Sequence, residues 1–309
     1  GLPAFMLTQC YSGSMRESGD MRRPMQASII AVISNLIGNY ILIFGKLGLP
    51  AMGVKGAAIS TVISRFVELF YLVRFAHAPE YPYLKGVYRT LRVPMSLIKR
   101  ISIKGLPLVV NELLWSISMM EVNQILSMRS LIALAAVNIT NTLGNLANVF
   151  MIGLSQTVAV FIGQRLGENE IEGAKKEAEG FILMAFLLQA AIGFVLLGLS
   201  GLFPKLYNVE SEVKLLATSF IITTAMISPF SGATVCSYYI LRSGGRTMIT
   251  FFTDSVYNWL VWIPVIYFLV VGTKLDINLV YRLSYATMLI KCLISVSMVK
   301  KGIWARKIV

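Results

Sequence analysis

Charged residues are scarce in this sequence, and their scarcity excludes an ordinary soluble enzyme. Only 14% of the 309 residues are Asp, Glu, Lys or Arg, whereas 56% are hydrophobic. The mean hydropathy of +0.71 agrees with this composition. Because a water-soluble domain carries about twice as many charged residues, we predict a protein embedded in a lipid bilayer.

Cysteine and histidine are also rare. Cys10, Cys236 and Cys292 stand alone in apolar stretches without a CxxC spacing, so neither a disulfide framework nor a zinc site is expected. His77 is the single histidine, two residues before Pro79 in a connection. A membrane-embedded enzyme would need clustered His, Asp or Ser residues, so we predict no enzymatic activity and no soluble cofactor.

Eight apolar runs are long enough to cross the hydrocarbon core, which takes about 20 helical residues. Ahead of them, residues 1–15 look like the second half of another membrane helix, so we expect that the chain begins in mid-helix. The eight runs are 24–45, 54–75, 97–127, 131–163, 180–203, 213–241, 247–271 and 278–299.

Basic residues exceed acidic ones by 28 to 15, and their positions indicate membrane topology instead of nucleic-acid binding. Of the 28, 19 fall on one set of alternate connections and 7 on the other. Since cytoplasmic connections retain Lys and Arg, we predict a cytoplasmic C-terminus. The connection 76–96, on the basic side, is interpreted as a cytoplasmic linker between two lobes.

The chain repeats itself at an offset of 226 residues, with six helices between the copies. An even number of helices gives both copies the same orientation, about an axis along the membrane normal. We therefore expect an all-α polytopic protein of two six-helix lobes, with about 130 residues of the N-lobe missing before Gly1. The expected parts are the end of the N-lobe (1–75), the linker (76–96) and the C-lobe (97–309). The matched pairs are Pro3 and Pro229, Cys10 and Cys236, Arg16 and Arg242, Gly19 and Gly245, Thr61 and Thr287, and Arg65 and Lys291.

Several stretches together resemble the multidrug and toxic compound extrusion (MATE) transporters, and NELLW is similar to Firmicutes-like bacterial members. The resemblance implies a two-lobed antiporter of the cell membrane that exports organic, often cationic, compounds in exchange for H⁺ or Na⁺. Its implied partners are the bilayer and small organic substrates. A flippase of the same superfamily, moving lipid-linked sugars, is the alternative, and a channel is disfavoured because the repeat is only twofold. The stretches are MRRPMQASIIAVISNLIGNYILIFGKLGLPAMGVKGAAISTVISR, ALAAVNITNTLGNLANVFMIGLSQTVAVFIGQRLGENE and LRSGGRTMITFFTDSVYNWLVWIPVIYFL.

Ionisable residues inside the apolar runs are candidates for function, because each costs at least a few kcal/mol to place in hydrocarbon. Glu112, beside Asn111 and one turn from Trp115, is interpreted either as the coupling or substrate carboxylate, with Na⁺ as a possible ligand, or as a structural partner of Lys291 or Arg65. Glu121 lies half a turn away from Glu112, so a structural role is expected for it.

Three further sets of polar residues lie within the apolar runs. Asp254, with Asn258 four residues on, is a second candidate for ion or substrate binding. Arg65 and Glu68 share a helix face and are expected to neutralise each other. Asn138 and Asn141 begin a stripe that faces either a wet cavity or a neighbouring helix.

Two departures from the family limit what the resemblance implies about the coupling ion. Asn39 stands where archaeal-type proton-coupled members have an Asp, and it cannot titrate. Ser231 stands where members of the NorM type have an Asp. The ion therefore stays open between H⁺ and Na⁺.

Overall fold

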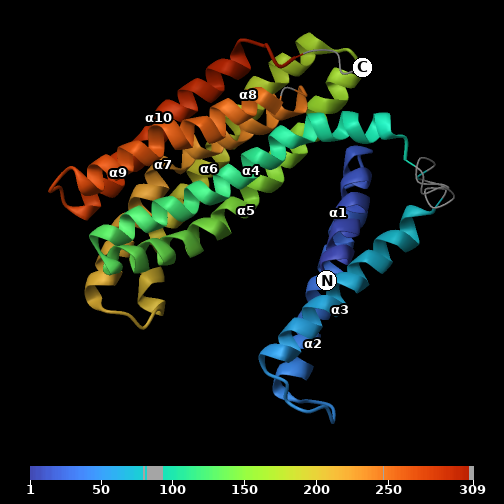
Figure 1. Cartoon of the computed structure of the whole chain (residues 1–309), viewed down its shortest axis with the longest axis horizontal. Helices are drawn as coiled ribbons and strands as arrows, with labels where there is room; N and C mark the ends of the chain where they lie inside the picture. The colour runs from blue at the N-terminus through green and yellow to red at the C-terminus, as the bar shows by residue number, and fades with distance from the viewer. Residues whose placement is uncertain (79–80, 82–92, 246, 306–309) are drawn as a thin grey trace. The chain divides into compact units, whose positions relative to one another are not determined.

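Long helices make up almost all of the structure, which is a computed structural model describing residues 1–78, 81, 93–245 and 247–305. No strand occurs among these residues. The chain divides into two compact units, Gly1–Pro94 and Met95–Val309 (Figure 1). The cytoplasmic linker predicted over 76–96 lies largely outside the described residues and stays a prediction.

The first unit is a group of three helices. Helix α3 packs along both α1 and α2. A loop with Asp20 at its end joins α1 to α2, and the Asp20 carboxylate accepts the backbone N–H groups of Arg22 and Arg23 at 2.9 and 3.2 Å. The helices are α1 (Leu2–Glu17), α2 (Arg22–Phe44) and α3 (Val54–Ala76).

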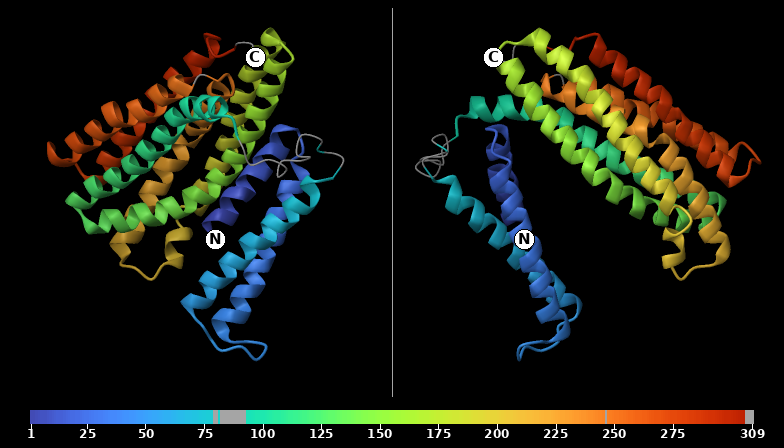
Figure 2. Two further views of the ribbon diagram at one scale, coloured as in Figure 1. Left: turned by 45° about the vertical axis from the view of Figure 1, so that its right-hand side comes forward. Right: turned by 180° about the vertical axis from the view of Figure 1, so that it is seen from behind.

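The second unit is a bundle in which α7 packs against α5, α6 and α10. Figure 2 shows, in two views, that its long helices run side by side. The segment 247–271 is continuous, but its middle part is wound as a π-helix. The elements are α4 (Met95–Arg129), α5 (Leu131–Gly167), α6 (Ile171–Leu199), η2 (Phe203–Leu206), α7 (Ser211–Ser243), α8 (Thr247–Phe251), η3 (Phe252–Val256), η4 (Asn258–Trp262), α9 (Ile263–Val271) and α10 (Ile277–Lys300).

Seven helical stretches of the described residues are long and apolar enough to cross a membrane. They correspond to seven of the eight predicted runs. The remaining run, 97–127, forms α4, which has 35 residues but is not among the seven. Lys99, Arg100, Glu112 and Glu121 make α4 more polar than the others.

One helix begins well before the predicted apolar run 180–203. Helix α6 begins nine residues earlier, at Ile171, and ends at Leu199. The early turns hold Glu172, Lys175 and other charged residues that lower hydropathy but favour helix. Hydropathy therefore identified only the apolar portion of this helix.

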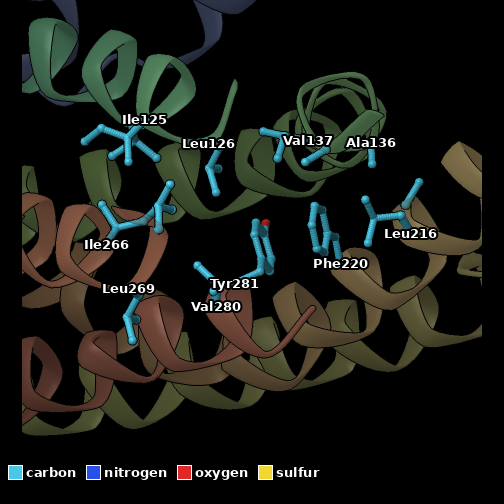
Figure 3. Close-up of a cluster of buried hydrophobic side chains, with 14 of the residues drawn as sticks. Ile125, Leu126, Ala136, Val137, Leu216, Phe220, Ile266, Leu269, Val280 and Tyr281 are labelled. Carbon is cyan, nitrogen blue, oxygen red and sulfur yellow. The ribbon is translucent and has the colours of Figure 1, made fainter. Parts of the chain in front are cut away.

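The buried centre of the second unit contains stacked aromatic rings. The centroid of the Phe220 ring lies 3.9 Å from that of Tyr281 (Figure 3). Tyr281 stacks in turn on Tyr285, with ring centroids 4.3 Å apart. Leu126 and Ile266 are fully buried in the same cluster. These contacts join α4, α7, α9 and α10 into one core.

Small residues allow α6 and α7 to approach closely. A Cβ atom added at Gly232 would lie 2.8 Å from the carbonyl oxygen of Ala185, and one added at Gly193 would lie 2.8 Å from that of Ala225. Between them, the Ser228 hydroxyl donates to the Gln189 carbonyl at 3.0 Å. Such close contact is how membrane helices associate without a hydrophobic driving force.

The ends of α1 and α7 support the 226-residue repeat. Helix α1 ends at Glu17, and helix α7 ends at Ser243, the position that the offset pairs with Glu17. The glycines that follow have positive φ angles, 93° at Gly19 and 72° at Gly245, which only glycine adopts without strain. Their N–H groups donate to the matching carbonyls of Arg16 and Arg242 at 2.9 and 3.0 Å.

The close approach at Gly232 predicts a loss of stability when it gains a side chain. We expect Gly232→Val to lower the free energy of unfolding by about 1–3 kcal/mol, because the added methyls meet the α6 backbone. Thermal unfolding in detergent measures this loss. Gly198→Val on α6 is the matched control, since a Cβ there meets nothing within 4 Å. Equal losses in the two variants would contradict the packing argument.

The start of α10 predicts a pH-dependent contribution. The Asp276 carboxylate accepts the backbone N–H of Asn278 at 2.9 Å. Hydrogen bonds from the side chain and then the backbone of Asn278 lower the pKa of Asp276 in the folded state. A lowered pKa contributes stability above the unfolded pKa of about 3.9, and this stability is lost as the pH falls through the folded value.

We therefore expect Asp276→Ala to cost about 1 kcal/mol at neutral pH, with a smaller loss in acid. Unfolding midpoints between neutral pH and about pH 3 test this expectation. Asp276→Asn is the control, because it keeps an N-cap acceptor but does not titrate. A cost for Asp276→Ala that is constant over this range would count against the interpretation.

Candidate functional site

A carboxylate and an ammonium group meet inside the second unit. The Lys291 Nζ atom on α10 donates to Asp254 Oδ1 at 2.6 Å. The side chains are only 9% and 18% exposed, respectively. Lys291 also donates to the Asn258 Oδ1 atom at 3.1 Å, and Asn258 is itself buried. The Asp254 carboxylate and the Asn258 amide, which belong to one segment, thus both bind the Lys291 ammonium group on α10.

Residues 252–262 place both groups toward Lys291. Asp254 and Asn258 are four residues apart, a spacing that puts both on one face of a helix. Asp254 falls in η3 and Asn258 begins η4. The indole of Trp259 donates to the Leu114 carbonyl at 3.2 Å, which holds this segment against α4.

Asn111 holds the other side of the Asp254 carboxylate. Its Nδ2 atom lies 3.2 Å from Asp254 Oδ2 and 3.3 Å from the Tyr238 hydroxyl. Its Oδ1 atom accepts the Ser255 hydroxyl at 2.6 Å. Since both ends of this buried amide are bound, Asn111 has one orientation, with donors directed at Asp254 and Tyr238.

Glu112 lies next to this network but on the outside of the unit. It is exposed, as is Trp115, a residue that is 44% exposed. The residue before Glu112, Asn111, contacts both the Tyr238 hydroxyl and the Asp254 carboxylate. Glu112 is therefore adjacent in sequence to the residue that joins these two groups.

The two cations expected as alternative partners of Glu112 each bind another carboxylate within their own unit. Lys291 is bound to Asp254, and Arg65 is bound to Glu68. Glu121 is partly buried, half a turn from Glu112 as the spacing predicts. The roles of both glutamates stay predictions.

The asparagine stripe on α5 faces away from the core of the second unit. Asn138 and Asn141 are exposed, as are Asn145 and Asn148. Among the described residues of this unit, no interhelical hydrogen bond to these amides is found. The choice between a wet cavity and a neighbouring helix stays open.

The first unit has a related cation. Arg65 Nη1 lies 2.8 Å from Glu68 Oε2, the ion pair expected from their spacing. The Ser28 hydroxyl donates to Glu68 Oε1 at 3.0 Å. Under the 226-residue offset, Arg65 corresponds to Lys291 and Ser28 to Asp254. Both copies therefore place a bound cation at the same position, but its carboxylate comes from the same helix in the first copy and from another segment in the second.

Two members of the network, Tyr238 and Ser255, have no role in the sequence-based hypothesis. The sequence-based hypothesis gives Asp254 a functional role and Lys291 a structural one, whereas in the structure the two side chains form an ion pair. Among the described residues, no group of three or more His, Cys, Asp or Glu side chains is arranged to bind a metal. A sodium ion near Glu112 stays a prediction.

The buried pair predicts an asymmetric response to substitution. We expect Asp254→Leu to lower the free energy of unfolding by about 3–5 kcal/mol, because it leaves the Lys291 ammonium without a counter-charge. The double variant Asp254→Leu/Lys291→Met should recover most of this loss, since neither charge is then buried. A double-mutant cycle by unfolding in detergent measures both quantities.

An exposed ion pair supplies the control for this cycle. Glu172 lies 2.8 Å from Lys175, and its side chain is 86% exposed. Glu172→Gln should cost less than about 1 kcal/mol. A double variant at Asp254 and Lys291 that is no more stable than Asp254→Leu would contradict the prediction.

Comparisons with known proteins place the chain in a family. The sequence profile described as MatE matches residues 107–268. The probable multidrug resistance protein YoeA of Bacillus subtilis is 24% identical over 278 residues, 89% of this chain and 60% of that protein. The probable multidrug resistance protein NorM of Thermotoga maritima is 27% identical over 212 residues, 66% of this chain and 43% of that protein. The chain thus spans about 60% of the length of relatives such as YoeA.

Solved structures agree in fold. The Vibrio cholerae MATE transporter VcmN in its bent form aligns with a TM-score of 0.84 at 17% identity, over 97% of this chain and 66% of that chain. The MATE transporter ClbM in complex with Rb⁺ aligns with a TM-score of 0.81 at 17% identity, over 98% and 67%. The profile match covers more than half of the chain and includes Asn111, Glu112, Tyr238 and Asp254. This multi-pass, all-helical membrane protein therefore belongs to the MatE family of transporters.

Proposed function

We propose that the full-length protein is a secondary antiporter that exports organic, cationic compounds in exchange for H⁺ or Na⁺ by alternating access. Relatives named as multidrug resistance proteins support this proposal. In this proposal the protein performs no covalent chemistry. Its substrates are small organic molecules, and its C-terminus is cytoplasmic because most Lys and Arg residues fall on that side.

The observation that carries the proposal is the charged pair on otherwise apolar helices. Ionisable residues within membrane segments are costly and are most often part of a substrate or ion pathway. Asp254 and Lys291 are held by Asn111 and Asn258, and Glu112 is exposed one residue from Asn111. The arrangement combines a buried titratable pair with an accessible carboxylate.

Each carboxylate has a distinct role in this proposal. Glu112 attracts the organic cation, and the aromatic face of Trp115 one turn away provides a cation–π surface. Asp254 is the coupling carboxylate. When it binds a proton, its attraction to Lys291 is lost and the contact between η3 and α10 weakens. A change in occupancy at Asp254 thereby changes which conformation is favoured.

Efflux from proteoliposomes tests the proposal. The full-length protein would be reconstituted with a fluorescent organic cation, and a proton or sodium gradient would be imposed. We expect gradient-driven efflux by the wild type, and efflux near the level of empty liposomes for Asp254→Asn. Glu112→Gln should raise the substrate concentration needed for half-maximal efflux, because it removes the attraction for the cation.

The control is Glu179→Gln, an exposed residue on α6, which should behave as the wild type. Full gradient-driven efflux by Asp254→Asn would move the coupling site away from the pair. No efflux with either gradient would favour the flippase alternative, which can be tested with a lipid-linked sugar in the same vesicles.

A further inference from the structure

The surroundings of the Lys291 ammonium are those of a bound cation. Its Nζ atom contacts one carboxylate oxygen, of Asp254 at 2.6 Å, and one amide oxygen, of Asn258 at 3.1 Å. The centroid of the Tyr257 ring lies 5.7 Å away. Carboxylate and amide oxygens are the ligands preferred by hard metal cations, and an aromatic face also attracts positive charge.

The ligands are fixed by contacts that do not involve Lys291. Asp254 is held from the other side by Asn111 at 3.2 Å. The Tyr257 hydroxyl donates to the Thr287 carbonyl at 2.5 Å, which fixes the ring against α10. The ligand positions therefore do not depend wholly on the lysine.

The Asn258 side chain, in contrast, is bound only by Lys291 among the described residues. Its Oδ1 atom accepts from Lys291, but its buried Nδ2 atom has no hydrogen-bond partner among the described residues. A buried donor without an acceptor is costly. Its orientation is therefore explained by the carbonyl oxygen serving as a cation ligand.

We propose that Lys291 is a tethered cation that fills a site suited to an alkali-metal ion, and that it thereby excludes Na⁺ from Asp254. The site consists of Asp254 Oδ1 and Asn258 Oδ1, with the face of Tyr257 alongside. Replacing the ammonium by a neutral side chain makes these oxygens available to Na⁺. The binding itself follows from the geometry, and only its consequence for the coupling ion rests on the proposed function.

The internal repeat supports a requirement for positive charge at this position. Arg65 corresponds to Lys291 under the offset and also binds a carboxylate, at 2.8 Å. Its carboxylate comes from Glu68 on the same helix, whereas that of Lys291 comes from another segment. The location of the negative charge differs between the copies, and the tethered cation is the feature they share.

The test measures Na⁺ binding in the full-length protein. Wild type, Lys291→Met and Lys291→Met/Asp254→Asn would be purified in detergent. Their melting temperatures would be compared in sodium chloride and in choline chloride at equal ionic strength, and radioactive Na⁺ binding would be measured directly. Lys176→Met, at an exposed position on α6, is the matched control for loss of a lysine.

We expect Na⁺ to raise the melting temperature of Lys291→Met by about 3 °C when its concentration is about ten times Kd, relative to choline. One additional Na⁺ should bind to this variant compared with the wild type and Lys176→Met. The increase should disappear in the double variant with Asp254→Asn. A folded Lys291→Met that gains no Na⁺, or a gain that survives Asp254→Asn, overturns the proposal.

A comparison without any substitution of the lysine guards against a variant that does not fold. Because Lys291 excludes Na⁺ from Asp254, the Na⁺ response of the wild type should be unchanged by Asp254→Asn alone. A wild-type response that this substitution abolishes overturns the proposal even if Lys291→Met cannot be purified. Failure of drug efflux would count against the proposed function but would leave the binding result intact.

Discussion

The ion pair between Asp254 and Lys291 imposes the strictest condition on the second unit, because its charges lie among apolar helices. Removing a charge from water costs several kcal/mol, and a pair recovers this only when its remaining donors and acceptors are also bound. Asn111, from α4, and Asn258, from η4, supply these contacts. The position of α4 against η3 and of η4 against α10 is thus set by one electrostatic requirement, while the core around Tyr281 fills the space beside it.

The 226-residue repeat shows which parts of this arrangement the two copies share. The helix ends at Gly19 and Gly245 have the same hydrogen bond and the same sign of φ, so the backbone of the two copies is equivalent there. The cations at Arg65 and Lys291 correspond as well. The carboxylates do not, since Glu68 is on the helix of its cation and Asp254 is on another segment. Either location satisfies the cation, because a counter-charge needs only to lie within reach of it.

Patterns of hydropathy and spacing predicted structure within single helices. They did not predict contacts between segments that are distant in the sequence. The membrane helices follow from hydropathy because a span must be apolar over its whole length. The pair of Arg65 and Glu68 follows from a spacing of three residues on one helix. In contrast, Asp254 and Lys291 are 37 residues apart on different elements, and Tyr238 reaches Asn111 across 127 residues. No periodic spacing in the sequence predicts either contact. The first turns of α6 lie outside the predicted apolar run for a related reason, because hydropathy measures preference for lipid and not for helix.

The adjacency of Asn111 and Glu112 gives the proposed antiporter a physical route for coupling. One side chain is locked to the buried pair, and the next is exposed on the same turn of α4. A cation that binds Glu112 shifts a conformational equilibrium only if its affinity differs between the two states. Rotation of α4 would change the exposure of Glu112 and, in the same movement, the bond between Asn111 and Asp254. In the proposed antiporter, substrate binding and the strength of the ion pair would thereby be linked through two consecutive residues, without a longer chain of contacts.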